Sequence, residues 1–390
     1  MSMLKYWLWL SAAPVSSKAK GALLRRYGDA ETAYFAPEGE FRSLEGVSAA
    51  EAGVLEDRDM SRVRRIVNEC RAQKISIVTM QDALYPQRLK NIYDPPAVLY
   101  VKGQLPAVDD SALIAVIGTR KASPYGLKMA GRLSYGITKC GGIVVSGLTA
   151  GIDAEAAKAA LMAGGTCIGV LGTAHEENRS PLARDVAEAG ALISEYPPGT
   201  VAQKSFFRAR NRISAGLSVG TVVVEAPKGS GALLFAREAL EQGKEIFAVP
   251  GNADSANSAG TIELLKDGAK PVTEAWDVIG EFSSIFPESL HPATEEAMPT
   301  ERENLPLSPA TPVKDDGGNT ADLRERLSQL SEQQLSIVTA IDSTGRHIDD
   351  IIEETALTSQ QVMGSITMLE IKGIVRRLPG NRIALNIAKK

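Results

Sequence analysis

The sequence is poor in the residue types that most often bind metals or form disulfides. Of its 390 residues, only three are cysteine and three are histidine. The cysteines stand far apart without a C-x-x-C pair, and the histidines have no zinc-ligand spacing. We therefore expect neither a metal site nor a disulfide framework. Cys140 and Cys167 lie in or beside apolar runs, so we expect them to pack in the core.

Long apolar runs are also absent. No stretch approaches the ~20 apolar residues that a membrane-spanning helix needs. The first residues include Trp7 and Trp9, but Lys5 interrupts them, and a basic start and a small-residue cleavage site are missing. We therefore expect no signal peptide, no membrane span and a cytoplasmic location.

The chain has no excess of positive charge. Its 43 Lys and Arg stand against 47 Asp and Glu, a formal net charge of −4. This balance argues against a protein that coats nucleic acid with a uniformly basic surface. A basic groove on one domain is compatible with it. With 390 residues, 44% of them hydrophobic, the chain is long enough for two to four globular domains.

Residues 112 to about 280 alternate between apolar runs and helical stretches. The runs ALIAVIG, GGIVVSG, TCIGVLG, ALISEY, GTVVVEA and EIFAVPG read as strands. Between most of them lie helical patterns at 127–140, 154–163, 181–189 and 231–242. Such alternation predicts an α/β fold with an open parallel sheet, whose ligands bind beyond the carboxyl ends of the strands.

The flanking regions differ from this pattern. We predict an N-terminal helical domain over residues 1–80, ahead of the α/β domain at 81–283. Residues 284–322 are rich in Pro, Glu, Ser and Thr, which predicts a disordered linker. Residues 323–390 read as three helices and a hairpin turning at 379–381, the pattern of a winged helix.

Four segments after predicted strands could bind anions. In LIAVIGTRKASPYG (113–126), Gly118 lets an anion approach the backbone, and Arg120 and Lys121 supply charge. This loop matches neither G-x-x-x-x-G-K-[ST] nor G-x-G-x-x-G. In the second segment, Ser146 and Gly147 end a strand, and Asp153 is expected to cap the following helix rather than to catalyse.

The third segment, KSFFRARNRISAGLS (204–218), places four cations beside two phenylalanines. Aromatic rings stack on bases while Arg and Lys hold phosphates, so this pattern is typical of single-strand binding. The fourth segment contains the cationic loop Lys228–Gly231, and its Glu225 is expected to pair with a nearby arginine. The four segments should meet at one sheet edge, which suits an extended polyanion better than a mononucleotide.

Motifs along nearly the whole chain resemble the DprA/Smf family of DNA-processing proteins. They are GTR (118–120), SGL…GID (146–153), SEYPPGT (194–200), F-x-x-RNRI-x-AGLS (207–218), VVEA…SGAL (223–233), ALEQGKEIFAVPG (239–251) and GAKPVTEAWDV (268–278). The flanks DPPAVLYVKG and VRRLPGNRIALN also match. Thr149, Ala150 and Ala157 depart from the family pattern SGLARGIDAAAH, so its arginine and histidine are missing here.

The resemblance implies a SAM-like N-terminal domain, an extended Rossmann-like domain that binds single-stranded DNA, and a C-terminal winged helix. The third helix of this winged helix is poor in cations before Lys372, which leaves three roles open: reading of duplex DNA, binding of a partner protein, or autoregulation. It also implies a homodimer that protects incoming DNA and loads RecA recombinase onto it in natural transformation. Single-strand-binding protein is an expected partner; no cofactor and no catalysis are implied. The expected DNA-binding residues are Gly118, Thr119, Arg120, Lys121, Ser146, Gly147, Lys204, Phe207, Arg208, Asn211, Arg212, Lys228, Gly229 and Ser230.

Two other functions are weighed against this one. The first is a Rossmann-type nucleotide phosphoribohydrolase, although its P-G-G-x-G-T-x-x-E signature is missing and only EAPKGSGAL stands nearby. The second is a winged-helix transcription regulator with an effector domain. Release of a free base would support the enzyme, and a specific duplex footprint would support the regulator.

Overall fold

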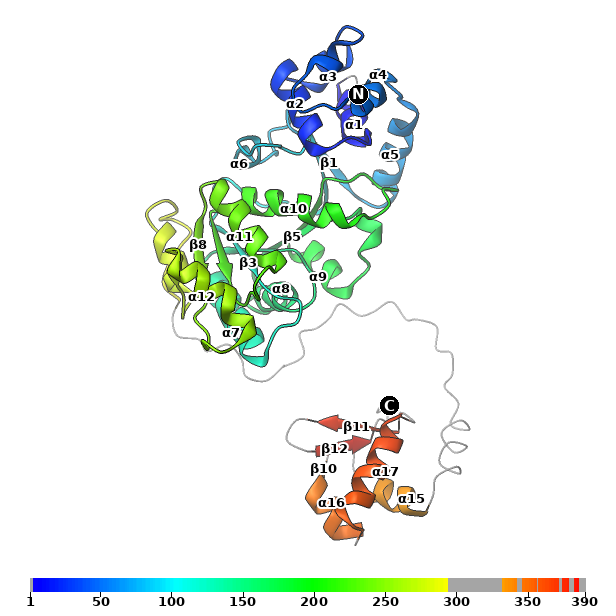
Figure 1. The fold of residues 1–390 in the computed structure, drawn as a ribbon, viewed down its shortest axis with the longest axis vertical. Helices are drawn as coiled ribbons and strands as arrows, with labels where there is room; N and C mark the ends of the chain where they lie inside the picture. The colour runs from blue at the N-terminus through cyan, green and yellow to red at the C-terminus, as the bar shows by residue number, and fades with distance from the viewer. Residues whose placement is uncertain are drawn as a thin grey trace. The chain divides into compact units, whose positions relative to one another are not determined.

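A computed structural model describes residues 3–293, 332–341, 346–355, 357–371, 374–378 and 382–385. The chain divides into two compact units, Met1–Leu305 and Pro306–Lys390, and each is described by itself. The first contains the N-terminal helices and a large sheet, and the second contains a small helical domain (Figure 1).

The first unit begins with five α-helices. They are α1 (Leu4–Ala12), α2 (Ser17–Tyr27), α3 (Ala30–Tyr34), α4 (Ala49–Glu56) and α5 (Ser61–Ala72). Side-chain caps fix the starts of three of them, α2, α3 and α4. Ser16 caps α2, and Ser48 and Glu51 form a capping box on α4. The helices pack around Trp7, Leu23 and other buried apolar side chains.

The sheet of the first unit has nine strands in the order β1-β2-β6-β5-β4-β3-β7-β8-β9. The strands from β6 to β9 pair in parallel, and β1 and β2 add an antiparallel edge. Their bounds are β1 Ser76–Thr79, β2 Val98–Gly103, β3 Leu113–Ile117, β4 Ile143–Ser146, β5 Cys167–Leu171, β6 Ala191–Ser194, β7 Gly220–Val223, β8 Glu245–Ala248 and β9 Lys270–Pro271. The predicted parallel α/β sheet is therefore confirmed.

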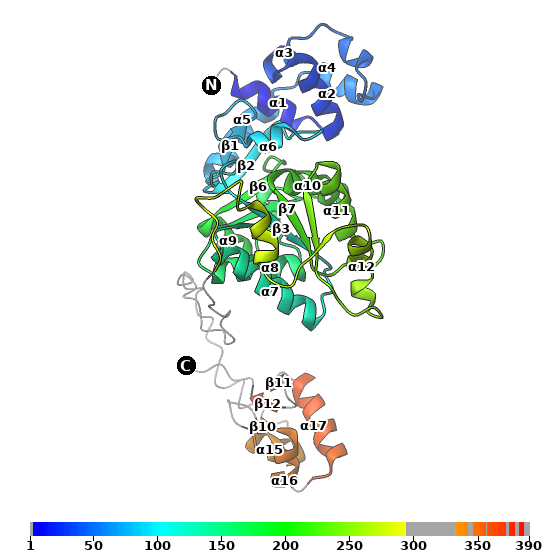
Figure 2. The ribbon, with the colours of Figure 1, turned by 90° about the vertical axis from the view of Figure 1, so that its left-hand side faces the viewer.

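Helices cover both faces of the sheet (Figures 1 and 2). One face packs against α7 (Pro124–Lys139), α8 (Ile152–Met162), α9 (Pro181–Ala189) and α13 (Trp276–Ile279). The other packs against α6 (Gln87–Lys90), α10 (Lys204–Leu217) and α11 (Gly231–Glu241), with α12 (Ala259–Lys266) following β8. Along β3, Ile114 and Val116 enter the first core, whereas Ala115 and Ile117 enter the second, as strand alternation requires.

The strand order reverses at β3. The chain first adds β4, β5 and β6 on one side of β3, then returns through α10 to add β7 on the other side. The loops that leave β3 and β7 therefore separate, and a crevice opens between them at the carboxyl ends of the strands.

Both predicted borders of the α/β domain differ from the structure. β1 lies before residue 80, yet it pairs with β2 in the sheet, and the Ser11 and Tyr100 hydroxyls are 3.0 Å apart across the junction. Beyond residue 283, Phe286 and Leu290 are buried in the core with α7 and α8. Proline-rich composition therefore placed the linker several residues too early; residues 294–322 lie outside the described residues.

The second unit contains α15 (Glu332–Thr339), α16 (Ile348–Thr355) and α17 (Ser359–Ile371). Its strands β10 (Arg346–His347), β11 (Val375–Leu378) and β12 (Arg382–Leu385) form an antiparallel sheet in the order β10-β12-β11. Ile337, Ile351, Val362, Ile366 and Ile383 are buried between helices and sheet. These elements match the predicted winged helix, and the turn at 379–381 lies outside the described residues.

Candidate nucleic-acid interface

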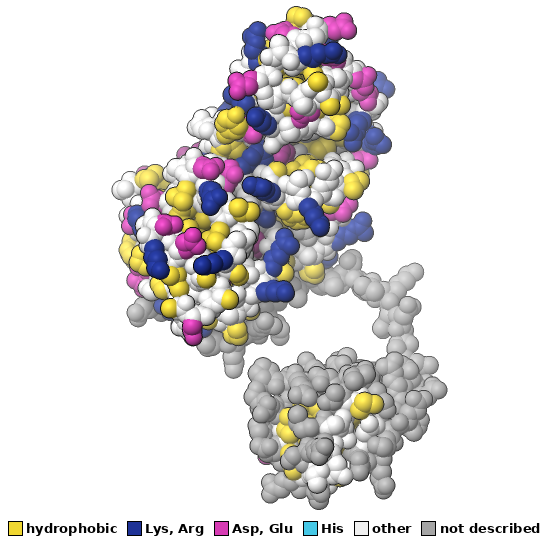
Figure 3. Space-filling view, in the orientation of Figure 1, with side chains coloured by type: hydrophobic (Ala, Val, Ile, Leu, Met, Phe, Trp, Pro, Cys, Tyr) yellow, Lys and Arg dark blue, Asp and Glu magenta, His cyan; other side chains and the backbone are white. Residues whose placement is uncertain are grey.

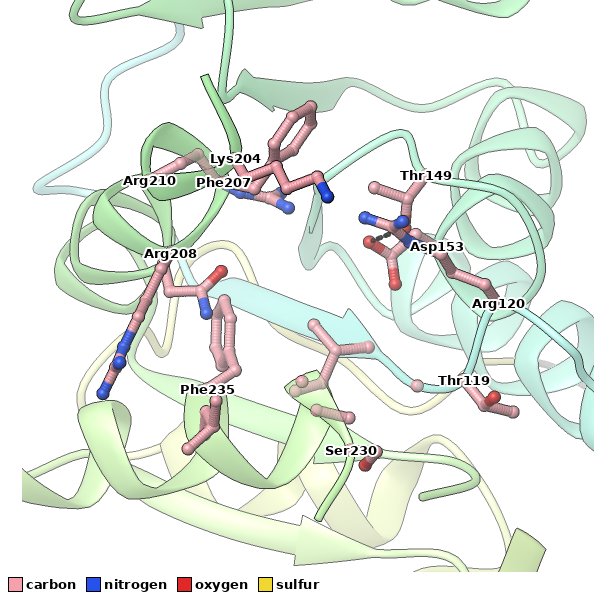
Figure 4. A pocket seen from close by; sticks show the side chains of 16 residues that line it. Thr119, Arg120, Thr149, Asp153, Lys204, Phe207, Arg208, Arg210, Ser230 and Phe235 are labelled. Carbon is pink, nitrogen blue, oxygen red and sulfur yellow. Dashed lines mark hydrogen bonds between the residues drawn. The ribbon is translucent and has the colours of Figure 1, made fainter. Parts of the chain in front are cut away.

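A cavity of about 450 Å³ opens at the crevice beside β3. Four segments line it: the loop after β3, the loop and first turn leading into α8, the N-terminal half of α10, and the first turns of α11 (Figure 4). These are the segments that the sequence predicted to meet, because each follows or precedes a strand at the same edge of the sheet.

Positive charge dominates the cavity wall. Arg120, Lys204 and Arg208 are exposed, and Arg210 is buried. Lys204 from α10 and Arg120 from the β3 loop point toward one another over the opening (Figure 4). Figure 3 shows Lys and Arg side chains gathered over the part of this face where α8 and α10 lie. Asp153 is the one carboxylate among the described residues that line the cavity.

Arg210 and Asp153 form the floor of the site. Burial lowers the pKa of Arg210, and the nearby Asp153 carboxylate opposes this shift without cancelling it. Burial also raises the pKa of Asp153, while Arg210 and hydrogen bonds from Thr149 and the Gly118 amide oppose that rise. Arg210 donates from Nη1 to the Val170 carbonyl at 3.3 Å, and its buried Nε has no hydrogen-bond partner among the described residues. The site therefore holds a partly satisfied cation.

Aromatic surface borders this charge. Phe207 is 37% exposed, and the Arg120 guanidinium lies 5.9 Å from the centroid of its ring. Phe207 packs so close to Gly172 that a Cβ at this glycine would come within 3.0 Å of it. Phe235 from α11 is buried behind the cavity wall. An exposed ring beside cations is suited to stacking a base while its phosphate is held.

The structure brings together eight of the predicted site residues. The cavity is lined by Gly118, Thr119, Arg120, Lys204, Phe207, Arg208, Asn211 and Ser230. Within α10, four of them are spaced as i, i+3, i+4 and i+7, so they share one face of the helix. The Ser230 hydroxyl is buried without a hydrogen-bond partner among the described residues.

The other candidates lie beside the cavity or beneath it. Lys121, Lys228 and Gly229 are exposed on the adjoining loops. Ser146 is buried, and its Oγ donates to the Asp153 carbonyl at 2.8 Å and accepts from the Leu148 amide at 3.0 Å. Ser146 therefore holds the start of α8 and does not face the cavity.

Arg212 and Gly147 were expected to contact DNA, but neither lines the cavity. The Arg212 guanidinium is buried in an ion pair with Glu195. Gly147 lies against Arg210, because a Cβ there would come 1.8 Å from Nη1 of that arginine. We therefore assign both residues a positioning role instead of the expected direct contact with DNA.

Two carboxylates differ from their predicted roles. Glu225 was expected to pair with an arginine, but it accepts hydrogen bonds from the Ser123 amide at 2.9 Å, the Ser123 hydroxyl and Nδ2 of Asn257 at 3.1 Å. Asp153 was expected to cap α8, but Gly151 occupies the N-cap position, and the Asp153 carboxylate bonds Thr149 instead. Glu225 lies outside the cavity, so its position does not favour catalysis there.

Sequence reasoning missed Arg210, Thr149, Asp153 and Phe235 as members of the site. Arg210 belongs to the cationic segment but lies off the stripe of Lys204, Phe207 and Asn211. Its long side chain reaches the cavity from a buried position, which helical spacing cannot indicate. Phe235 lies four residues after Gly231 on α11, so helical spacing from the predicted loop at 228–231 could have indicated it.

Two classes of feature were also sought in the described residues. Within them, no helix is both long enough and apolar enough to cross a membrane. The same residues contain no group of three or more His, Cys, Asp or Glu side chains that could hold a metal ion.

Comparisons with known proteins agree along most of the chain. Residues 76–283 match the family described as DNA recombination-mediator protein A, and residues 321–381 match the DprA winged helix domain. The DNA processing protein DprA of Bacillus subtilis is 40% identical over 56% of this chain and 75% of its own length. Protein Smf of Synechocystis is 31% identical over 82% of both chains.

A solved structure supports the same assignment. The X-ray structure of DNA processing protein A from Streptococcus pneumoniae has a TM-score of 0.61 and 31% sequence identity to this chain. The match covers 71% of this chain and 97% of that protein.

Proposed function

Because this chain belongs to the DprA/Smf family of DNA-processing, recombination-mediator proteins, we propose that it binds single-stranded DNA in the cavity at the carboxyl edge of its sheet. The observation that supports this most directly is the combination of exposed Arg120, Lys204 and Arg208 with the half-exposed ring of Phe207. Cations hold phosphates regardless of sequence, and an aromatic face accepts any base, so this combination suits an unpaired strand.

The bound strand would serve recombination. In this proposal the protein covers incoming single strands, works as a homodimer, and loads RecA recombinase onto DNA coated with single-strand-binding protein during transformation. It does so by binding alone. The site residues fit this role, since the cavity wall contains cations and aromatic rings, and its one carboxylate, Asp153, is held by Arg210 and Thr149.

The direct test is binding of a labelled oligo-dT, followed by fluorescence anisotropy over a range of salt concentrations. We expect the affinity to fall steeply with salt, and the slope of log K against log salt to decrease by about 0.7 for each phosphate contact removed, as in Arg120→Ala. Lys158→Ala provides the matched control, because Lys158 is exposed on α8 but does not line the cavity. Binding that ignores salt, prefers duplex DNA or survives Arg120→Ala unchanged would contradict the proposal.

RecA loading needs a separate experiment. RecA and single strands coated with single-strand-binding protein should exchange strands faster when this protein is added, and Arg120→Ala should remove the acceleration while Lys158→Ala keeps it. No acceleration by a wild-type protein that binds oligo-dT would refute loading and leave DNA binding in place. Release of free base from nucleoside monophosphates would instead support the hydrolase alternative.

A further inference from the structure

A second cavity lies on the other side of the first turn of α10. Its volume is about 490 Å³, and it opens between the N-terminal helices and the segment from Tyr196 to Val201 that leads into α10. Lys20 of α2 and Arg62 of α5 line one wall, and Phe206 of α10 lines the other. Both walls belong to the first compact unit.

The charge of this second cavity is positive. Nζ of Lys20 donates to the Ser11 carbonyl at 2.6 Å, and Nη1 of Arg62 donates to the Ala12 carbonyl at 3.3 Å. Burial lowers the pKa of Lys20 to about 8, so its ammonium is still protonated at neutral pH. An ammonium has three protons and a guanidinium has five, so one hydrogen bond does not use all the donors of either cation. No Asp or Glu is present among the described residues that line this cavity. The cavity is therefore suited to an anionic ligand.

The same cavity presents a pair of aromatic rings. Tyr196 and Phe206 stack with their centroids 3.9 Å apart and their planes 16° apart. Stacking uses one face of each ring, and both side chains remain partly exposed. A planar base could extend the stack, in the way that bases stack on aromatic side chains of single-strand-binding proteins.

The two cavities are neighbours along α10. Lys204, Phe207 and Arg208 line the first cavity, whereas Gln203, Ser205 and Phe206 line the second. Because these residues lie on opposite sides of the start of α10, within its first two turns, the two cavities are separated by about the width of a helix, roughly 10–12 Å with side chains. A single strand that leaves the first cavity can cross this turn within a few nucleotides.

We propose that the second cavity is an additional subsite for single-stranded DNA, in which Lys20 and Arg62 hold a phosphate and a base stacks on the Tyr196–Phe206 pair. The inference rests on the proposed function of the first cavity and deepens it. It gives the N-terminal helices a direct share in DNA binding. The strand then lies across α10 and contacts both the helical region and the sheet.

The test is a length series of oligo-dT, from about 4 to about 16 nucleotides, the range of site sizes found for single-strand-binding domains. Arg62→Ala and Lys20→Met should weaken binding of the longest oligonucleotide about tenfold and leave that of the shortest unchanged. The salt slope should decrease by about 0.7 for the longest one alone. Arg64→Ala is the matched control, because Arg64 lies on the same helix and faces a different cavity.

A second measurement needs no variant. Ultraviolet cross-linking of the longest oligo-dT to the wild-type protein, read by mass spectrometry, should label the peptide that contains Tyr196 or Phe206. Cross-links confined to the first cavity, or variants at Lys20 and Arg62 that bind every length like the wild type, would overturn the subsite. Failure of the proposed function looks different, since the wild type would then bind no oligonucleotide or Arg120→Ala would leave the shortest one unaffected.

Discussion

Arg212 on α10 and Glu195 at the end of β6 form a bidentate ion pair. Nη2 of Arg212 lies 2.6 Å from Oε1 of Glu195, and Nη1 lies 3.0 Å from Oε2. Both side chains are only 9% exposed. Nε of the same arginine donates to the Asp94 carbonyl at 2.8 Å. The pair thus ties α10 to the end of β6 and to the loop before β2, and it fixes the helix that presents Lys204 and Phe207.

Removing one partner of this pair should destabilise the protein. Arg212→Met leaves Glu195 buried without its counter-charge, so we expect a loss of about 3–5 kcal/mol in the free energy of unfolding. The double variant Arg212→Met with Glu195→Leu should recover most of that loss, because no unpaired charge remains. Urea denaturation measures both effects. An Arg212→Met protein with wild-type stability but without affinity for oligo-dT would restore Arg212 as a direct DNA contact.

The sequence predicted the sheet well because the evidence for it is local. Each strand is a short apolar run, and each loop that lines the first cavity is adjacent to such a run, as with Gly118 after Ile117. Arg212 could not be assigned in this way. Four cations stand within nine residues at 204–212, and what separates Arg212 from Lys204 is a tertiary partner, Glu195, on another element.

Two further differences have the same physical origin. Gly147 was expected to contact DNA, but the space beside it is filled by Arg210, which only the packing of α10 against β4 and β5 places there. Phe286 and Leu290 lie in a segment of linker-like composition, yet they are buried because they meet the apolar faces of α7 and its neighbours. Composition describes a window of residues, whereas burial depends on single side chains.

Phe207 and Arg120 should affect DNA binding in different ways. Phe207→Leu keeps an apolar side chain and removes the stacking face, so we expect a loss of about 1–3 kcal/mol in binding free energy with an unchanged salt slope. Arg120→Ala should lower both affinity and slope, because it removes a charge. Anisotropy titrations of oligo-dT at several salt concentrations separate the two effects. A reduced slope in Phe207→Leu would show instead that the ring positions Arg120, which lies 5.9 Å away.

Glu51 should make the stability of the N-terminal helices depend on pH. Burial alone would raise the pKa of Glu51, but hydrogen bonds from Ser16 and Ser48 lower it to about 2. A carboxylate whose pKa is depressed by folding stabilises the folded state above its ordinary pKa near 4.5, and this contribution is lost as the pH falls toward 2.

The variant Glu51→Gln should therefore lose about 1 kcal/mol of stability at pH 7, the usual size of a capping contribution. Its difference from the wild type should shrink as the pH falls below about 4.5. Urea denaturation at a series of pH values measures this, with Glu45→Gln as the control at an exposed carboxylate nearby. A difference that stays constant down to pH 3 would mean that the Glu51 charge contributes nothing.

Gly147 should be required because of Arg210. A Cβ at position 147 would lie 1.8 Å from Nη1 and 2.6 Å from Cζ of Arg210, so Gly147→Ala must displace the buried guanidinium. We expect this variant to lose about 1–3 kcal/mol of stability and to bind oligo-dT more weakly, because Arg210 leaves the floor of the cavity.

Gly53→Ala is the control, since a Cβ there meets nothing within 4 Å. In an Arg210→Ala background the added Gly147→Ala should cost little, and this coupling in a double-mutant cycle identifies the clash as the cause. If the two substitutions were additive, Gly147 would instead contact DNA directly, the role first expected from the sequence.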